Sequence, residues 1–195
     1  MKKVISSISL AGVLALGFLT GCQSPPENPP QTVESVDLQR YTGLWYEIAR
    51  LPMPFQKADE RATAKYTINS DGAVDLVNTA IALDGETRSV TGTAVPVPNS
   101  FNTKLKVTID VFFAKLFGSP PDFGNYWVIK LEDDYSLALV GSPSRNSLWL
   151  LARKPQIDPQ VLESYLQHAR DQGYNTEEII IHNGGTGSGA NGSSF

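Results

Sequence analysis

The sequence of 195 residues has one cysteine, two histidines and no long run of charge of either sign. One cysteine cannot close an internal disulfide, so packing alone has to stabilise the folded domain. His168 and His182 lie apart in the sequence and are a poor start for a metal site. Clusters of lysine and arginine, which phosphate binding requires, are missing as well. These absences count against a disulfide framework, a metal centre and a nucleic-acid partner.

Motifs for catalysis or cofactor binding are also lacking. The chain has no G-x-S-x-G turn, no cysteine beside a histidine and no glycine loop of the phosphate-binding type. Glu132, Asp133 and Asp134 form a run of carboxylates that would suit a metal or acid–base chemistry, but they fall between two predicted strands. We interpret them as a solvated turn, and we expect no cofactor and no enzymatic activity.

The N-terminus explains the single cysteine. Met1–Lys3 is basic, and the apolar or small residues from Val4 to Leu19 follow without a charge, which is typical of a secretory signal. "LTGC", ending at Cys22, resembles the lipobox of bacterial lipoproteins, in which the cysteine is acylated and becomes the mature N-terminus. Gln23 replaces the aspartate that signals inner-membrane retention in many bacteria. The resemblance therefore implies lipidation of Cys22 and the outer membrane, facing the periplasm; the alternative is a plain signal peptide cut near Gly21.

The rest of the chain divides by composition. After a signal over residues 1–21, four prolines in "SPPENPPQT" favour an extended tether within residues 22–35. Residues 36–182 are long enough for one domain with a sizeable core. Residues 183–195 are almost all glycine, serine and other small polar types, and we expect them to be disordered.

The domain reads mostly as strands. Segments rich in β-branched and aromatic residues alternate with turn signals, and we expect strands at residues 43–51, 61–69, 73–81, 86–95, 103–113, 125–131, 135–142 and 147–153. The links among the first seven are too short to hold a crossover helix, which favours antiparallel neighbours. "EIIIH" near the end is a candidate for a short ninth strand.

One helix follows these strands. Asp158 is a suitable N-cap, Pro159 a suitable first helical residue, and Gly173 is placed to end the helix. Between them an apolar stripe recurs at helical spacing: Val161, Leu162, Tyr165, Leu166 and Ala169. The predicted fold is mainly β: an eight-stranded antiparallel up-and-down β-barrel with one C-terminal α-helix packed on the outside, because closure removes exposed strand edges.

Two segments of the sequence resemble a known family. "GLWYEIAR" (Gly43 to Arg50), preceded by "DLQRYTG", is similar to the first signature of the lipocalins, and residues 125–155 are similar to the second and third run together. The similarity is greatest to bacterial lipocalins, relatives of apolipoprotein D. It covers about residues 36–181, although Thr79 to Asp122 fits loosely. The resemblance implies a calyx-shaped barrel that binds a fatty acid or a lysophospholipid.

The first signature also suggests structural roles. Gly43 allows a bend or a close approach that a side chain would forbid. Strand alternation puts Trp45, Glu47 and Ala49 on one face, and Arg50 on the other with Tyr46 and Ile48. By resemblance, Trp45 plugs the closed end of the barrel and Arg153 stacks on its ring. The alternative role for Trp45 is contact with ligand.

Candidate ligand contacts come from the loop after the first strand, "RLPMPFQKADER". Its apolar residues Leu51, Met53 and Phe55 would be costly to expose unless they cover something apolar. They are either a lid that contacts ligand or a lid packed permanently on its own barrel. Cationic side chains nearby are candidates for binding the carboxylate or phosphate head group of the ligand. The proposed ligand-binding set is Met53, Phe55, Lys57, Arg61, Tyr66 and Tyr126, with Lys65 a further cation.

Three hypotheses for function remain from the sequence. The first is a membrane-anchored lipocalin that binds and stores or transports lipids, in membrane repair or lipid handling. The second is an enzyme acting on a lipid, because fold does not fix function. The third is an interaction module whose barrel is filled with side chains. The sequence does not decide between a monomer and a homodimer.

Overall fold

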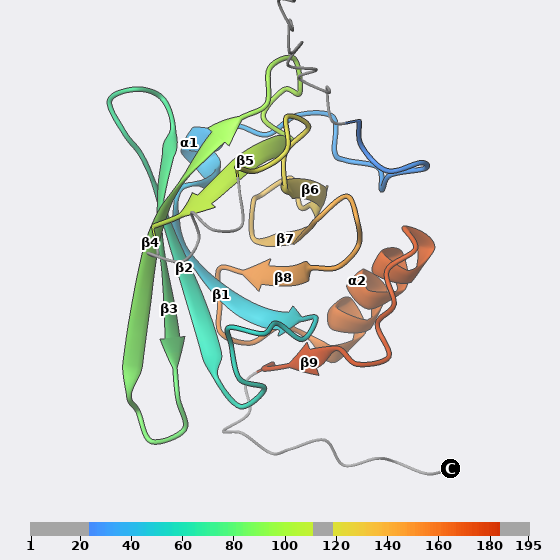
Figure 1. Ribbon diagram of the computed structural model, residues 1–195. Helices are drawn as coiled ribbons and strands as arrows, with labels where there is room; N and C mark the ends of the chain where they lie inside the picture. Colours follow the sequence, from blue (N-terminus) through green and yellow to red (C-terminus); the bar gives the residue numbers. More distant parts are fainter. Residues whose placement is uncertain (1–23, 111–118, 184–195) are drawn as a thin grey trace, which may run out of the picture.

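The structure is a computed structural model that describes residues 24–110 and 119–183. Within these residues, eight strands form the barrel, in the order expected from the sequence (Figure 1). They are β1 (Gly43–Arg50), β2 (Arg61–Ile68), β3 (Val74–Ile81), β4 (Thr87–Pro96), β5 (Lys104–Ile109), β6 (Tyr126–Leu131), β7 (Leu137–Gly141) and β8 (Leu148–Ala152). The short helix α1 (Leu38–Tyr41) precedes β1 and was not expected; its N-cap is Asp37.

Closure of the barrel depends on β1. This strand pairs antiparallel with β2 along one edge and with β8 along the other, so the sheet that begins at β2 returns to it. All pairs are antiparallel, and from β1 to β8 each strand pairs with the next in sequence, with the β1–β8 pair closing the barrel; this confirms the predicted up-and-down barrel. The short strand β9 (Ile180–Ile181) pairs with the end of β1, as the "EIIIH" segment suggested.

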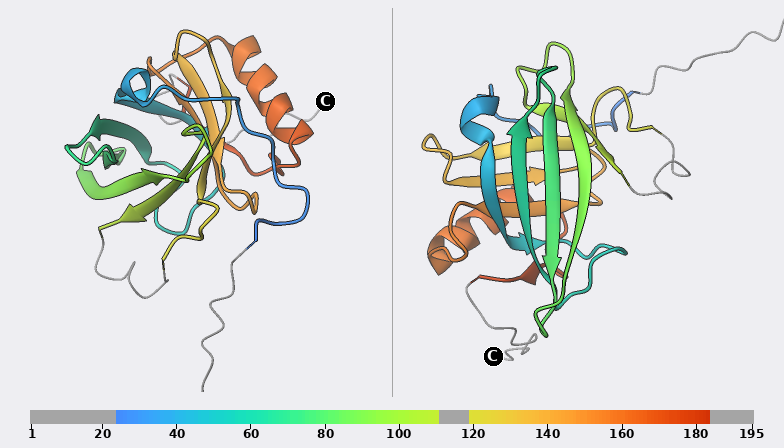
Figure 2. Two further views of the ribbon diagram at one scale, coloured as in Figure 1. Left: turned by 90° about the horizontal axis from the view of Figure 1, so that it is seen from above. Right: turned by 90° about the vertical axis from the view of Figure 1, so that its left-hand side faces the viewer.

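Helix α2 (Pro159–Asp171) lies along the outside of the barrel wall (Figure 2). Asp158 caps its N-terminus by accepting a hydrogen bond from the Gln160 amide at 2.7 Å, and Gly173 follows it with a φ of +84°. Leu162, Tyr165, Leu166 and Ala169 are buried against outward-facing residues of the barrel wall. The predicted cap, apolar stripe and end of this helix are confirmed.

The alternation predicted for β1 fails after Glu47. The pairing of β1 with β8 shifts register between Glu47 and Ala49, which is a β-bulge. The extra residue turns Arg50 to the same face of the strand as Glu47, and Arg50 Nε lies 3.2 Å from Glu47 Oε1. Simple alternation placed these two side chains on opposite faces, and that prediction was wrong.

At one end of the barrel, Trp45 is completely buried beneath α1. Its indole nitrogen donates a hydrogen bond to the Tyr41 carbonyl at 2.9 Å, and the Arg153 guanidinium lies 3.8 Å from the centre of its ring. Arg153 also donates to the carbonyl oxygens of Leu44, Arg40 and Tyr135. Gly43 has a φ of +95°, and a Cβ there would stand 3.3 Å from Arg153 Nη1. This end of the barrel is therefore sealed by a compact, hydrogen-bonded cluster.

The proline-rich segment before the barrel is bound to the domain for much of its length. Pro30 is buried, the Asn28 carbonyl accepts from Arg145 at 2.7 Å, and the Gln31 amide donates to Gln172 at 2.8 Å. The Val33 amide donates to the Val128 carbonyl at 3.0 Å. The predicted tether is therefore held against the domain from Asn28 onward. Cys22 and the tail from residue 184 lie outside the described residues.

The sealed end predicts a large cost for losing Trp45. Trp45→Ala should lower the free energy of unfolding by about 3–5 kcal/mol, as for a large buried aromatic side chain. Leu44→Ala, an exposed neighbour on the same strand, should change it by less than about 0.5 kcal/mol. Urea unfolding of both variants measures the difference; a Trp45→Ala protein as stable as Leu44→Ala would contradict the structural role.

Candidate ligand-binding site

A pocket opens at the end of the barrel opposite the Trp45 cluster. It has a volume of about 620 Å³ and lies between the β1–β2 loop and the hairpin that joins β3 to β4. Its walls come from residues 53–57 and Glu60 of the loop, and from Ala80, Ala82, Asp84, Glu86, Thr87 and Arg88 of the hairpin and its strands. Three residues predicted from the sequence, Met53, Phe55 and Lys57, line this pocket.

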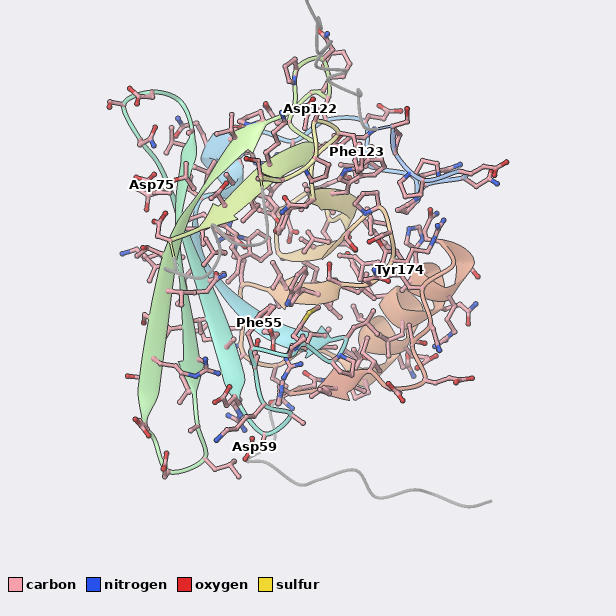
Figure 3. All side chains as sticks on the ribbon, viewed as in Figure 1. Phe55, Asp59, Asp75, Asp122, Phe123 and Tyr174 are labelled. Carbon is pink, nitrogen blue, oxygen red and sulfur yellow. The ribbon has the colours of Figure 1, made fainter. Side chains whose placement is uncertain are left out.

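The apolar residues of the loop differ in burial. Leu51 is buried and Met53 is half-buried against the main core cluster, so both belong to the packing of the barrel. Phe55 is 67% exposed at the pocket (Figure 3). An apolar ring left in water is unfavourable, so Phe55 is the residue of this loop with apolar surface free to cover a ligand.

A buried polar clamp holds the loop from below. Arg50 is fully buried and donates to the carbonyl oxygens of Leu51 at 3.1 Å and Lys57 at 2.6 Å. Gln56 Nε2 donates to Glu47 Oε1 at 3.1 Å, next to the contact between Glu47 and Arg50. Burial raises the pKa of Glu47 to about 7, and the nearby Arg50 charge only partly opposes this rise. The sequence did not point to this clamp, because it depends on the bulge.

A second clamp joins the loop to the hairpin. Arg88 forms an ion pair with Glu60 and donates to the Phe55 carbonyl at 3.0 Å. The hydrogen bond from Arg88 lowers the pKa of the Glu60 carboxyl. The Arg88 side chain is 53% exposed at the pocket wall, and the sequence analysis missed it. Lys57 is exposed and makes no ion pair with another residue that the structure describes.

Arg61 and Lys65 are not at this pocket. Cross-strand partners share a face of the sheet, and Ala64 of β2 pairs with the inward-facing Trp45. Arg61 is three residues from Ala64 and Lys65 is one residue from it. Because side chains alternate between the two faces of a strand, both lie on the outer surface of the barrel. Their proposed contact with a ligand head group has no geometric support.

Tyr66 and Tyr126 face inward, but near the sealed end and not at the mouth. Their hydroxyl oxygens are 3.5 Å apart, and the Tyr126 hydroxyl is 2.8 Å from that of Tyr41. The Tyr41 and Tyr66 rings stack with centres 5.8 Å apart. The six predicted contacts therefore separate into three at the mouth, two deep in the barrel, and Arg61 outside.

Between these two regions several inward positions of β2 and β3 carry small side chains. Following the pairing from Trp45 to β2 and β3 gives the inward-facing residues Ala62, Ala64 and Ala80. Other inward residues are only half-buried, among them Asn78, Val90 and Trp149. An eight-stranded barrel either fills with side chains or holds one small ligand, and small residues at these positions favour a ligand.

Potential metal-ligating side chains do not cluster in residues 24–110 and 119–183. These residues contain no group of three or more His, Cys, Asp or Glu side chains that could hold a metal ion. Glu132 of the carboxylate run accepts a hydrogen bond from Tyr165 at 2.6 Å, and Asp134 accepts one from the Ser136 amide at 2.9 Å. No helix in the described part of the chain is both long and apolar enough to span a membrane.

A closed barrel, sealed at one end and open at a pocket at the other, is the architecture of a protein that binds small ligands in its interior. The family model for the lipocalin-like domain matches residues 36–183. The chain therefore belongs to the lipocalin family of ligand-binding proteins.

Individual relatives agree with this assignment. The chain is 32% identical over 170 residues to the outer membrane lipoprotein Blc of Vibrio cholerae, covering 86% of this chain and 94% of that protein. It is 34% identical over 153 residues to temperature-induced lipocalin-1 of Arabidopsis thaliana, covering 76% and 80%. Lobster apocrustacyanin A1 is similar in structure, with a TM-score of 0.55 at 17% identity over 80% of this chain and 90% of the other. That last likeness shows the fold alone.

The two carboxylates of the clamps should give opposite pH dependences. Glu47 binds its proton more tightly in the folded state, so its contribution favours folding below about pH 4.5 and is lost as pH rises to about 7. Relative to wild type, Glu47→Gln should therefore gain stability between these values, by up to about 3 kcal/mol. Urea unfolding at a series of pH values measures this gain.

Glu60→Gln is the matched control, because the folded-state pKa of Glu60 is lowered. Its contribution is present above the unfolded pKa and is lost as the pH falls, so this variant should lose stability at neutral pH and recover it in acid. Parallel pH profiles for the two variants would show that Glu47 is not held in a desolvating site.

Proposed function

We propose that this protein is a membrane-anchored lipocalin that binds one lipid, a fatty acid or a lysophospholipid, and carries or stores it at the outer membrane. The observation that carries this proposal is the pocket at the mouth, where the exposed ring of Phe55 stands beside the cation Lys57. An amphiphile needs both kinds of contact.

The acyl chain would lie along the inward alanines of β2 and β3, and the head group would stay at the mouth. Apolar surface buried in this way contributes about 25 cal/mol per Å². Lys57 can donate a charge-assisted hydrogen bond to a carboxylate or a phosphate, because its exposed side chain forms no ion pair with a described residue. Arg88 is already engaged by Glu60, so it would position the loop and leave the head group to Lys57.

The membrane location rests on Cys22 and on the relatives. The lipobox-like "LTGC" and the outer-membrane lipoproteins among the relatives both support acylation at this cysteine. Because the chain is bound to the domain from about Asn28, at most six residue steps, or about 20 Å, separate the anchor from the barrel. The protein would therefore work close to the lipid surface and meet lipids released from it.

The first test concerns the loop. Phe55→Ser should weaken binding of a fluorescent fatty acid by about tenfold, since 1.4 kcal/mol corresponds to one decade. Thermal unfolding of the ligand-free variant should change little, because the ring contributes little to the core. Phe101→Ser is the control: Phe101 is 74% exposed, in the loop between β4 and β5, and it does not line the pocket.

Equal affinities in the two phenylalanine variants would exclude Phe55 as a ligand contact. If the wild type itself showed no saturable binding of the fluorescent fatty acid, the carrier function would be contradicted. Met53→Ser is expected to lower both the affinity and the melting temperature, because Met53 packs against the core.

The second test concerns the anchor. Cys22→Ala should move the protein from the membrane fraction to the soluble or unprocessed fraction without altering its unfolding transition. Ser24→Ala, two positions away, should leave fractionation unchanged. A Cys22→Ala protein that matures normally and stays in the membrane would show that the lipobox interpretation is wrong.

A further inference from the structure

Three phenol hydroxyls meet inside the barrel near its sealed end. Tyr41 comes from α1, Tyr66 from β2 and Tyr126 from β6, three elements that are distant in sequence (Figure 1). The Tyr126 oxygen lies 2.8 Å from that of Tyr41 and 3.5 Å from that of Tyr66. Gly43 stands opposite Tyr66 in the register and offers its ring no competing side chain.

These hydroxyls do not satisfy one another. Each phenol has one hydrogen to donate and two lone pairs to accept with. The two contacts within the cluster use at most two of the three hydrogens, and the contact at 3.5 Å is weak. No other hydrogen bond to these hydroxyls comes from the described residues. At least one donor and several acceptor positions therefore remain open in apolar surroundings, which is unfavourable unless another group fills them.

The cluster faces the interior of the barrel. Tyr41 is buried, but Tyr66 and Tyr126 keep accessible surface although their strands turn them inward. The distance along β2 from Ala62, near the mouth, to Tyr66 is about 13 Å at 3.3 Å per residue. A bound acyl chain would thus reach the cluster with its middle or inner part.

The chemistry of the cluster selects a neutral partner. Burial raises the pKa of Tyr66 and of Tyr126, so both remain protonated donors. Arg153, the cation beside this end, is engaged by three carbonyl oxygens and the Trp45 ring. A carboxylate at the cluster would be buried without a free cation, which is costly, whereas a hydroxyl or carbonyl would not.

We propose that Tyr41, Tyr66 and Tyr126 form a polar subsite that hydrogen-bonds a hydroxyl or carbonyl group carried on the acyl chain of the ligand. This inference rests on the proposed lipid-binding function and narrows it to oxygenated acyl chains. Tyr126 is the central contact, because its hydroxyl is shared by the other two.

The test compares stearic acid with a mid-chain hydroxystearic acid in competition with a fluorescent fatty acid. Wild type should bind the hydroxylated probe about five- to tenfold more tightly, the gain of one added hydrogen bond. Tyr126→Phe should abolish this preference while leaving the affinity for stearic acid within about twofold. Tyr66→Phe should reduce the preference and serves as a second variant if Tyr126→Phe folds poorly in thermal melts.

Tyr46→Phe is the matched control, because Tyr46 adjoins Trp45 on the strand and faces the outside of the barrel. It should keep the full preference. Equal affinity of wild type for the two probes would overturn the subsite and leave the carrier function standing. A preference that survives in both Tyr126→Phe and Tyr66→Phe would overturn it as well. Failure of both probes to bind would overturn the proposed function together with the subsite.

Discussion

Strand β1 is hydrogen-bonded to a neighbouring strand along each of its two edges, and the rest of the architecture depends on this double pairing. Its partners β2 and β8 close the sheet, so the inward faces of all eight strands surround one interior. The same strand begins at Gly43 in the sealed end and finishes at Arg50 beneath the mouth. A bulge after Glu47 then adds the buried clamp to a strand that otherwise serves closure.

The two ends of the barrel use polar contacts for different purposes. At the sealed end, Arg153 satisfies carbonyl oxygens and covers Trp45, which excludes water from the plug. At the mouth, Arg50 and Arg88 hold the carbonyls of the β1–β2 loop and leave the Phe55 ring exposed. A loop fixed by its backbone with one free aromatic ring is prepared to cover a ligand at little entropic cost. The mouth therefore combines a rigid frame with a small adaptable contact.

Features set by local signals were predictable from the sequence. The cap at Asp158, the stripe on α2 and the end of this helix at Gly173 follow from residue type and spacing alone. Arg50, Arg88 and Tyr41 were missed as site residues, because their roles depend on a bulge, on cross-strand register and on an unexpected short helix. The same lack of register information left Arg61 among the candidates, although alternation places it outside. Sequence reasoning located the loop at the mouth but not the clamps that hold it.

The central claim is that the interior of this barrel holds a lipid. Native mass spectrometry of the full-length protein, released from membranes and purified without detergent in the final steps, tests it most directly. The account predicts a population heavier than the protein alone by the mass of one single-chain lipid, which collisional activation removes. A single population at the mass of the protein alone, unchanged when lysophospholipid or fatty acid is added, would contradict it and favour a barrel filled by its own side chains.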